Sequence, residues 1–387
     1  MKINSILVFF HVGSNTGYAI EPLEQTFFNM AKMLVNDESN IHFAYTNMDK
    51  GHPRILPEHF KNVITFDYDD SSSDSLTSIY EYIKENGINV AFGFDQSVVN
   101  LPSYRSIRKA GVRCFISYYG APMSSINSGM KLWLKKLQVK LIRCKPDHYI
   151  YESYAMAETA VFGRGLSQKD VSVVHTGVDT EKYCPAISET FYAHEKFGIP
   201  KNRNIIFYSG HMERRKGVHV IVKAAVELAV NRKREDIHFV ITGNKNGEEK
   251  AFDEIYRGTT AENYITFGGY CDDLTKIIPS CHIGTIASVG WDSFPRSALE
   301  MGACGLPLLV SNLQGIPEAI EIGKTGFVFE PGNSEELAEK IEYFIDNPEI
   351  REQFSKNARA RILEGFTLKD NEENLVKVVR DVVGTIR

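Results

Sequence analysis

The sequence predicts an α/β protein built from two doubly wound, Rossmann-like domains that face each other across a cleft. Short β-branched or aromatic apolar runs alternate with longer amphipathic stretches along the whole chain, and strands separated by helix-length segments form parallel sheets. The alternation pauses over residues 176–203, which have little strand character, and then restarts. A chain of 387 residues has room for about two to three domains.

The first half of the chain is expected to form one sheet with its covering helices. The predicted strands are the short apolar runs Ile6–Val12, Ile41–Tyr45, Val63–Phe66, Val90–Phe94, Cys114–Ser117, His148–Tyr151 and Val171–Val174. Segments with helical periodicity lie between them, and include Leu23–Val35, Ser75–Asn86, Met130–Arg143 and Ala155–Val161. This order predicts βαβ units.

The second half repeats the pattern. Its predicted strands are Ile205–Tyr208, His238–Thr242, Tyr264–Phe267, His282–Ala287, Pro307–Val310 and Gly326–Phe329, and its predicted helices include Val218–Val230, Arg296–Gly302, Ser334–Phe344 and a last amphipathic helix, Leu368–Val383. We place an N-terminal domain at 1–176 and a C-terminal domain at 177–365. Ligands of parallel sheets bind beyond the carboxyl ends of the strands, so the cleft is the expected site.

Composition narrows the function classes. Apolar residues make up 43% of the chain and charged residues 24%, with a formal net charge of −5, which excludes a wholly disordered chain and makes nucleic acid an unexpected partner. No apolar run approaches the roughly 20 residues that span a bilayer. The apolar run near the start lacks a small-x-small cleavage site and is interpreted as a first buried strand. The six cysteines include no CxxC pair, and a cytoplasmic protein is expected.

One segment, 291–300, combines two acids with a helix start. Asp292 precedes the predicted helix and Glu300 lies two turns inside it. Pro295 suits the first turn of a helix, since its missing N–H is unpaired there in any case. The free N–H groups of Arg296 and Ser297 then suit a phosphate, and the two acids suit sugar or ribose hydroxyls. The alternative is a core helix with a cap and a surface glutamate.

Five segments in order resemble one enzyme family. They are His175–Asp179 (HTGVD), Gly210–Gly217 (GHMERRKG), Phe267–Tyr270 (FGGY), Asp292–Pro307 (DSFPRSALEMGACGLP) and Leu313–Glu318 (LQGIPE), the last followed by Gly326 and Phe327. The fourth resembles the E-x7-E segment of family 4 glycosyltransferases, the retaining nucleotide-sugar enzymes of the GT-B fold. The resemblance is strong in the C-terminal half and weak in the N-terminal half.

The resemblance implies transfer of a hexose-type sugar from a nucleotide-diphosphate sugar, UDP rather than GDP, to an acceptor hydroxyl in glycan or glycolipid synthesis. It implies retention at the anomeric carbon. The C-terminal domain would bind the donor and the N-terminal domain the acceptor, with residues 366–387 returning to the N-terminal domain. The nucleotide sugar is a substrate, so the resemblance implies no cofactor and no metal. The acceptor could be a sugar, a lipid-linked compound or a small molecule.

The resemblance also implies roles for single residues. Lys216 would hold the donor diphosphate, Asp292 the hydroxyls of the transferred sugar, and Glu300 the ribose. Tyr119 occupies the place of a family histidine beside the transferred sugar, and we group it with Asp292 and Lys216 as catalytic. The remaining donor-binding candidates are Gly17, Gly210, His211, Arg215, Phe294, Pro295, Arg296 and Ser297.

Several of these positions depart from the family pattern. His211 stands where the family has a second phosphate-binding arginine, for which Arg214 or Arg215 could substitute. Asp292 is one methylene shorter than the family glutamate, and Pro295 has no N–H to donate. At Tyr119 a hydroxyl can donate a hydrogen bond but is a poor general base at neutral pH. His11 is a second candidate there, with a core histidine as the alternative.

A basic segment, 130–145, carries six basic residues and no acid. If helical, it is both apolar and cationic, which suits peripheral contact with an anionic membrane surface. The alternative is a buried helix whose lysines line a solvated edge. The expected location is therefore the cytoplasm, with peripheral contact at the inner face of the membrane as a further option.

Two other functions remain open. The same architecture carries epimerases and phosphorylases, so the fold alone does not separate transfer from those reactions. The departures at Asp292, His211, Pro295 and Tyr119 also leave room for an inactive nucleotide-sugar-binding partner subunit. A dinucleotide oxidoreductase is disfavoured, because no predicted strand is followed by G-x-G-x-x-G.

Overall fold

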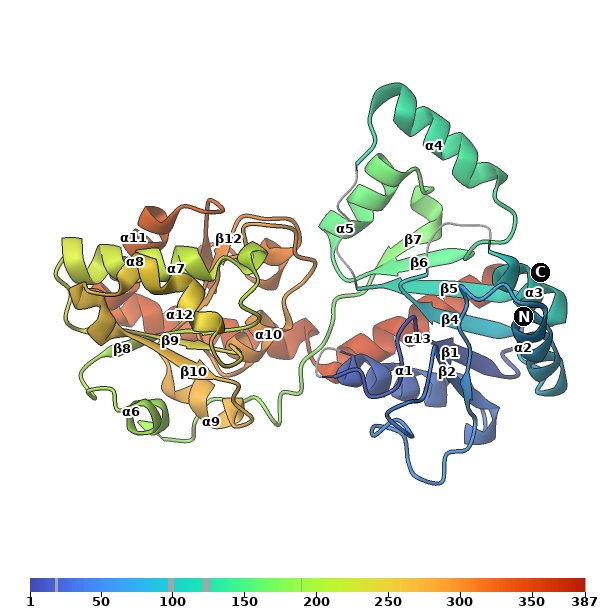
Figure 1. The fold of residues 1–387 in the computed structure, drawn as a ribbon, viewed down its shortest axis with the longest axis horizontal. Coiled ribbons are helices and arrows are strands. Elements are labelled where there is room, and N and C mark those ends of the chain that lie inside the picture. The colour runs from blue at the N-terminus through green and yellow to red at the C-terminus, as the bar shows by residue number, and fades with distance from the viewer. Residues whose placement is uncertain (18–19, 97–100, 121–125, 189, 387) are drawn as a thin grey trace. The chain divides into compact units, whose positions relative to one another are not determined.

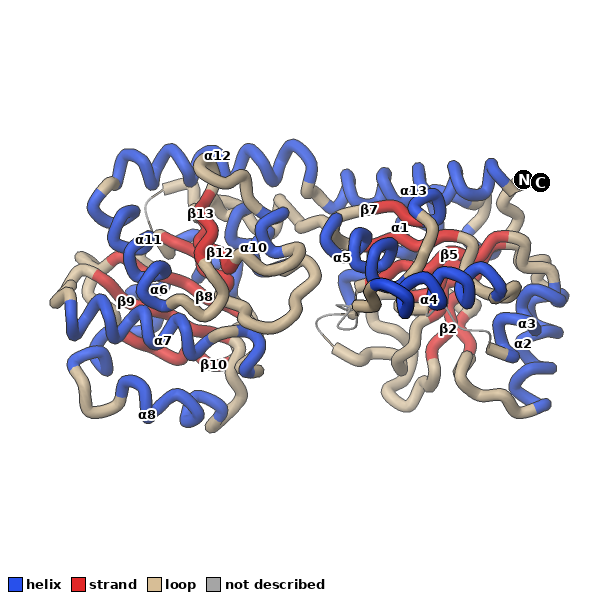
Figure 2. Tube along the Cα trace, turned by 90° about the horizontal axis from the view of Figure 1, so that it is seen from above, coloured by secondary structure: helices blue, strands red, loops and turns tan. Residues whose placement is uncertain are grey.

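The computed structural model describes residues 1–17, 20–96, 101–120, 126–188 and 190–386. The chain divides into two compact units; in Figure 1 the first is blue to green with one red helix, and the second runs from green through yellow to red. The first unit contains Met1–His175 and Lys369–Arg387, and the second contains Thr176–Leu368. Each is a parallel sheet with helices on both faces (Figure 2), the doubly wound α/β architecture that the sequence predicts.

The sheet of the first unit has seven strands in the order β3-β2-β1-β4-β5-β6-β7, all paired in parallel. The strands are β1 (Ile6–Phe9), β2 (Ile41–Tyr45), β3 (Val63–Thr65), β4 (Val90–Phe94), β5 (Cys114–Tyr119), β6 (His148–Tyr151) and β7 (Val171–Val173). The direction of the strand order reverses between β1 and β4. Ligands of such sheets bind beyond the carboxyl ends of the two strands at this point.

The helices of the first unit bury apolar side chains on both faces of this sheet. They are α1 (Glu21–Leu34), α2 (Ser73–Glu85), α3 (Pro102–Ala110), α4 (Gly129–Leu141), α5 (Tyr154–Glu158) and α13 (Leu368–Thr385). One core contains side chains of α1 and α13, and the core on the other side contains side chains of α2 and α3. The chain thus returns to the first unit after building the second.

Contacts far apart in sequence fix α13 beside α1. Leu375 and Val379 of α13 are fully buried in the same core as Phe27 of α1. The Asn29 amide donates to the Glu372 carboxylate over 2.7 Å. The return of the C-terminal helix to the N-terminal unit, expected from the family resemblance, is therefore present (Figure 1).

The sheet of the second unit has six strands in the order β10-β9-β8-β11-β12-β13. The strands are β8 (Asn204–Ser209), β9 (Ile237–Thr242), β10 (Ile265–Gly269), β11 (Ile283–Ile286), β12 (Leu308–Ser311) and β13 (Gly326–Phe329). All pairings are parallel. Here the strand order reverses between β8 and β11, so the loops after these two strands are the expected binding edge.

Two cores lie on the two faces of the second sheet. The helices are α6 (Tyr192–Phe197), α7 (Val218–Val226), α8 (Asp253–Tyr256), α9 (Leu274–Ile277), α10 (Arg296–Ala303), α11 (Ser334–Asp346) and α12 (Pro348–Gly365). Side chains of α7, α8 and α11 share one core, and those of α6, α9 and α10 share the other, while α12 contributes Phe354 to the first and Ile362 to the second. Since α10 is packed in this way, the segment that carries Glu300 is anchored against the sheet.

Candidate functional site

The loops after β8 and β11 bring a lysine and an aspartate together at the carboxyl edge of the second sheet. Lys216 ends a short 3₁₀ turn after β8, and Asp292 follows β11. The Lys216 Nζ atom lies 2.6 Å from the Asp292 Oδ2 atom, and the two side chains keep only 19% and 8% of their exposure. Both residues are candidates from the sequence, and the loops after the two strands that flank the reversal of strand order bring them into contact.

Glycine at position 217 allows these two loops to touch. Gly217 has a φ of 72°, and a Cβ atom there would lie 1.7 Å from the Ala287 carbonyl oxygen. Next to this contact, the Val289 and Gly290 amides donate to the Arg215 carbonyl at 2.8 and 3.1 Å. No larger residue fits at position 217 without separating the loops.

Three further hydrogen bonds fix Asp292. The Ser288 hydroxyl donates to Oδ2 at 2.8 Å, and the Ser293 amide donates to Oδ1 at 3.1 Å. The Asp292 amide donates to the Gln314 side-chain carbonyl at 2.9 Å. A carboxylate held this firmly has a defined position for a ligand. Sequence reasoning did not single out Ser288 or Gln314, although Gln314 lies inside one of the family-like segments.

The amino terminus of α10 lies four residues beyond Asp292. Pro295 is its N-cap residue, and Arg296 and Ser297 are its first two residues, both half-buried. The Arg296 Nη1 atom is buried and finds no hydrogen-bond partner among the described residues. Glu300, further along the helix, is buried. A guanidinium and a helix amino terminus both favour a phosphate.

The Gly210–Lys216 segment contains the remaining donor-site candidates of this loop. Gly210 lies against Gly243, where a Cβ atom would approach the Gly210 carbonyl to 2.4 Å. His211 is exposed, and its carbonyl accepts a hydrogen bond from the Tyr208 hydroxyl at 3.0 Å. Burial raises the pKa of Tyr208 well above its ordinary value, so this hydroxyl stays a donor.

Arg215 is already engaged within this loop. Its Nε atom bonds the Glu213 carboxylate at 2.6 Å, and its Nη1 atom donates to the Trp291 carbonyl at 3.3 Å. The guanidinium also lies 5.8 Å from the centre of the Trp291 ring. Arg214 is exposed and lies near His219, whose pKa is lowered mainly by burial and further by Lys223 and Arg214. Arg215 would have to leave its two partners to reach a phosphate.

Phe294 packs in a different environment from the neighbouring site residues. Its side chain is buried, and its ring stacks on Phe366 with the centroids 6.0 Å apart. The side chain therefore belongs to the core of the second unit. If Phe294 serves the donor site, it does so through its backbone or by holding the loop in place.

A second cluster lies at the carboxyl edge of the first sheet, around β1 and β4. The His11 ring stacks on Phe94, and its Nδ1 atom lies 4.0 Å from the Asp95 carboxylate. Asp95 has a φ of 56°, and its other oxygen accepts the Gly120 amide at 2.8 Å. Asp95 was not among the sequence candidates. Its position directly after a buried strand is the signal that could have found it.

Tyr119 and Gly17 belong to this same unit. Tyr119 ends β5, and its ring stacks on Tyr151 with the centroids 5.5 Å apart. Gly17 precedes α1 with a φ of 123°, and no atom lies within 4 Å of where its Cβ would be. Buried Glu152, which follows β6, accepts the Tyr118 hydroxyl at 3.3 Å. The sequence candidates are therefore divided between the two units, with His11, Gly17 and Tyr119 in the first and the others in the second.

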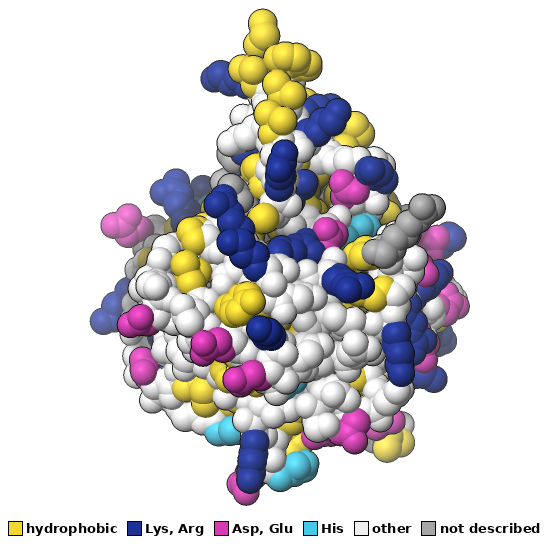
Figure 3. Space-filling view, turned by 90° about the vertical axis from the view of Figure 1, so that its right-hand side faces the viewer, with side chains coloured by type: hydrophobic (Ala, Val, Ile, Leu, Met, Phe, Trp, Pro, Cys, Tyr) yellow, Lys and Arg dark blue, Asp and Glu magenta, His cyan; other side chains and the backbone are white. Residues whose placement is uncertain are grey.

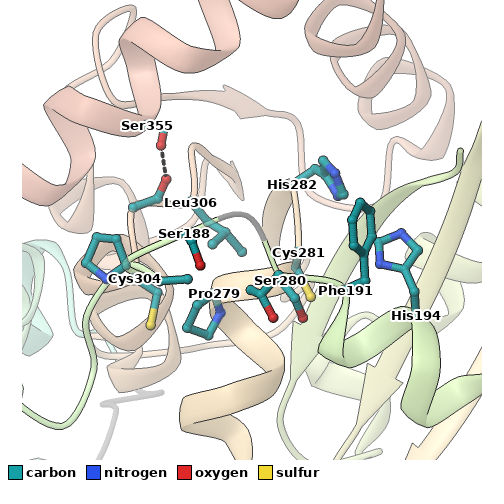
Figure 4. A pocket seen from close by; sticks show the side chains of 14 residues that line it. Ser188, Phe191, His194, Pro279, Ser280, Cys281, His282, Cys304, Leu306 and Ser355 are labelled. Carbon is teal, nitrogen blue, oxygen red and sulfur yellow. Dashed lines mark hydrogen bonds between the residues drawn. The ribbon is translucent and has the colours of Figure 1, made fainter. Parts of the chain in front are cut away.

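Two pockets of the second unit lie on opposite edges of its sheet. One, of about 470 Å³, lies at the carboxyl ends of β9 and β10 and is lined by polar groups that include Asn244 and Glu249. The other, of about 290 Å³ (Figure 4), is lined by Cys281 and His282, which precede β11. Burial lowers the pKa of His282 to about 4 and raises that of Cys304, in the same pocket, to about 12. Both groups are neutral at pH 7, and this amino-terminal edge lies away from the Lys216–Asp292 pair.

Within the described part of the chain, no group of three or more His, Cys, Asp or Glu side chains is arranged to hold a metal ion. No described helix combines the length and the apolar character that crossing a bilayer requires.

Comparison with known proteins finds similarity to glycosyltransferases. Residues 191–361 match the family model described as "Glycosyl transferases group 1". The UDP-Gal:alpha-D-GlcNAc-diphosphoundecaprenol alpha-1,3-galactosyltransferase of Escherichia coli is 24% identical over 314 residues, which cover 80% of this chain and 79% of that protein. Other curated relatives are matched over about half of their own length.

Solved structures match over nearly the whole chain. A glycosyltransferase from Rickettsia africae has a TM-score of 0.80 at 18% identity, with 99% of both chains covered. Anabaena HepE, solved in complex with UDP, has a TM-score of 0.78 at 18% identity, with 97% of this chain and 100% of that chain covered. The fold is therefore that of the GT-B glycosyltransferases.

Proposed function

We propose that the protein is a retaining glycosyltransferase that moves a hexose-type sugar from a UDP-sugar to an acceptor hydroxyl. The observation that carries the proposal is the Lys216–Asp292 pair, 2.6 Å apart at the carboxyl edge of the second sheet. This edge lies in the part of the chain that matches the group 1 transferases. The Escherichia coli relative is a UDP-Gal transferase, which supports a uridine donor.

Lys216 and the start of α10 would bind the donor diphosphate. An ammonium group has three donors, so Lys216 can keep its bond to Asp292 and still donate to a phosphate oxygen. The buried Arg296 Nη1 atom adds an unused donor, and the amino terminus of α10 adds partial positive charge. Positive groups that are already in place stabilise the charge that develops on a departing diphosphate.

Asp292 would orient the transferred sugar and Glu300 the ribose. Three hydrogen bonds fix the Asp292 carboxylate, so it cannot move toward a sugar that binds in a different position. Because it is shorter than the family glutamate, its position selects sugars whose hydroxyls come about an ångström closer to the loop. Glu300 is buried on α10 and can accept from ribose hydroxyls at the same edge.

The chemical step forms one bond and breaks one bond on the same face of the sugar. The acceptor oxygen bonds to the anomeric carbon while the bond from that carbon to the diphosphate oxygen breaks. The leaving diphosphate takes the acceptor proton, so no protein base is needed. In the first unit, Tyr119 would donate a hydrogen bond to a sugar oxygen, and the acceptor would bind to this unit.

Donor turnover with analysis of the anomer tests the proposal. The protein is incubated with UDP-glucose, UDP-galactose, UDP-N-acetylglucosamine or GDP-mannose, and nucleotide release and sugar configuration are followed by NMR. We expect UDP release from one UDP-sugar, with an α-configured product first. In a parallel incubation with inorganic phosphate, formation of sugar 1-phosphate together with UDP would instead indicate phosphorolysis. Conversion of the donor to a different UDP-sugar would indicate epimerisation. Binding without release from any donor, with a broad acceptor panel present, would favour the inactive partner subunit.

A further inference from the structure

The outer face of α4 is apolar and exposed to solvent. In Figure 3 hydrophobic side chains gather at the projecting top of the molecule, formed by α4, among Lys and Arg. The exposed fractions are 75% for Met130, 60% for Trp133, 53% for Leu134, 43% for Leu137 and 69% for Leu141. Single exposed apolar residues are normal in proteins, whereas a contiguous group of this kind marks an interaction site.

These five side chains lie on one face of the helix. Positions 130, 133, 134, 137 and 141 repeat at the three- and four-residue spacing of an α-helix with 3.6 residues per turn. Val139, the buried residue of α4, lies on the opposite face. The buried-helix alternative from the sequence is therefore wrong, because α4 turns most of its apolar surface outward.

Lysines border this apolar face on both sides. At 3.6 residues per turn, Lys131 and Lys135 follow one border and Lys136 and Lys140 the other. Within the described residues, none of the four forms an ion pair with an acid. Segment 130–145 as a whole has six basic residues and no acid.

The orientation of α4 is fixed by backbone contacts on its inner side. A Cβ atom at Gly165 would lie 2.9 Å from the Lys136 amide nitrogen, so the two backbones touch. The Asn127 amide donates to the Gly163 carbonyl at 2.8 Å just before the helix begins. Val139 packs with Tyr149 and Tyr151. The apolar face therefore points outward as part of the fold.

We propose that α4 binds the surface of an anionic lipid bilayer. The helix would lie in the plane of the interface, with its apolar side chains among the upper acyl carbons and its lysines at the anionic headgroups. A second copy of this chain is a poorer occupant, because pairing two such faces would place like-charged lysines opposite each other. The proposal goes beyond the proposed transferase activity and does not depend on it.

Vesicle binding of the full chain tests the proposal without donor or acceptor. We expect cosedimentation with vesicles that contain about one third phosphatidylglycerol, little with pure phosphatidylcholine, and loss of binding as salt is raised. Trp133 emission should shift to shorter wavelength on binding, and Trp133→Phe should remove that shift. Binding equal for both vesicle types, or no binding to either, would overturn the proposal.

Matched variants separate the two contributions. Lys136→Gln with Lys140→Gln should weaken binding about fivefold for each lysine removed, and Trp133→Ser with Leu137→Ser should weaken it at least as much. The control is Leu363→Ser with Lys356→Gln on α12, where Leu363 is 49% exposed; it should bind like the wild type. Unchanged binding in the α4 variants would contradict the proposal. Self-association that the apolar variants abolish, without vesicle binding, would assign this face to a second copy.

Discussion

At the residue level, the proposed donor site depends on the Lys216–Asp292 pair. Both side chains are largely removed from water, and desolvation offsets much of the attraction in such a pair, so it contributes little to stability. Its value lies in holding one positive and one negative group where a nucleotide sugar would meet them. The carboxylate is fixed by Ser288 and Ser293 as well as by the lysine.

Replacing Asp292 by Asn removes the charge with little change of shape. We expect turnover to fall about a hundredfold, because the sugar loses its fixed acceptor group. UDP affinity should be kept or increased, because Lys216 loses its competing carboxylate. Steady-state kinetics and calorimetric titration with UDP measure the two effects. Turnover unchanged in Asp292→Asn would remove Asp292 from the site.

Gly217→Ala should be far more destabilising than a comparable glycine change. A methyl group at position 217 would collide with the Ala287 carbonyl, whereas the Cβ position of Gly247, which also has positive φ, meets no atom within 4 Å. We expect the free energy of unfolding to fall by more than about 3 kcal/mol for Gly217→Ala and by about 1 kcal/mol for Gly247→Ala. Similar melting temperatures for the two variants would contradict the loop contact.

Glu24 should make stability fall as pH rises. Burial raises its pKa to about 7 from 4.5, so the folded state keeps a proton that the unfolded state loses between these pH values. This contribution is complete below about pH 4.5 and is lost progressively up to pH 7, by at most about 3 kcal/mol. Calorimetry at pH 5 and pH 7.5 should show a pH-dependent stability difference between wild type and Glu24→Gln. If the difference in free energy of unfolding between the two proteins is the same at both pH values, the Glu24 carboxyl is exposed to solvent and not buried.

At the residue level the sequence predicted part of the site. Lys216 and Asp292 could each be named in advance because each lies in a distinctive segment, but their contact could not, since it depends on how the loops after β8 and β11 meet. Gln314 was missed because its contact with Asp292 spans 22 residues and its backbone has a φ of 48°. Asp95 directly follows a buried strand, which marks it as a candidate, but the contacts of its carboxylate depend on a φ of 56° that the sequence does not show. The core position of Phe294 depends on Phe366, which is distant in sequence.

At the level of elements, the strands were easier to predict than the helices. A buried parallel strand such as β9 is a continuous apolar run with sharp ends, so sequence marks it clearly. Helix α12 was not among the predicted helices, because its buried residues are only Phe354, Ala358 and Ile362, too sparse for a clear periodicity. Helix α4 was predicted, but which of its faces is buried depends on Gly165 and Val139.

Helix α13 shows how one element can decide the stability of a distant unit. Leu375 is fully buried in the first unit's core. Leu375→Ala should therefore cost about 2–5 kcal/mol, while Leu363→Ala on α12, where the side chain is 49% exposed, should cost less than about 1 kcal/mol. Chemical denaturation of both variants measures this. Equal losses would show that α13 adds nothing to that core.

At the level of the whole molecule, the two units have separate cores. Calorimetry should therefore resolve two unfolding transitions, and Leu375→Ala should lower only one of them. UDP should raise the temperature of the other transition. At a hundred times its dissociation constant, UDP adds about 2.7 kcal/mol to the free energy of unfolding of that unit. A single transition that both changes move together would mean that the units unfold as one.

Calorimetric titration of UDP into the wild type, Lys216→Ala and Lys223→Ala is the most direct test of a diphosphate site at the Lys216–Asp292 pair. Lys223 is an exposed lysine on α7, seven residues beyond Lys216, and serves as the matched control. We expect UDP binding by the wild type and Lys223→Ala, with affinity at least about tenfold weaker in Lys216→Ala, a loss of about 1.4 kcal/mol in binding free energy. Equal affinity in all three proteins, or no UDP binding by the wild type, would contradict a diphosphate site at the Lys216–Asp292 pair.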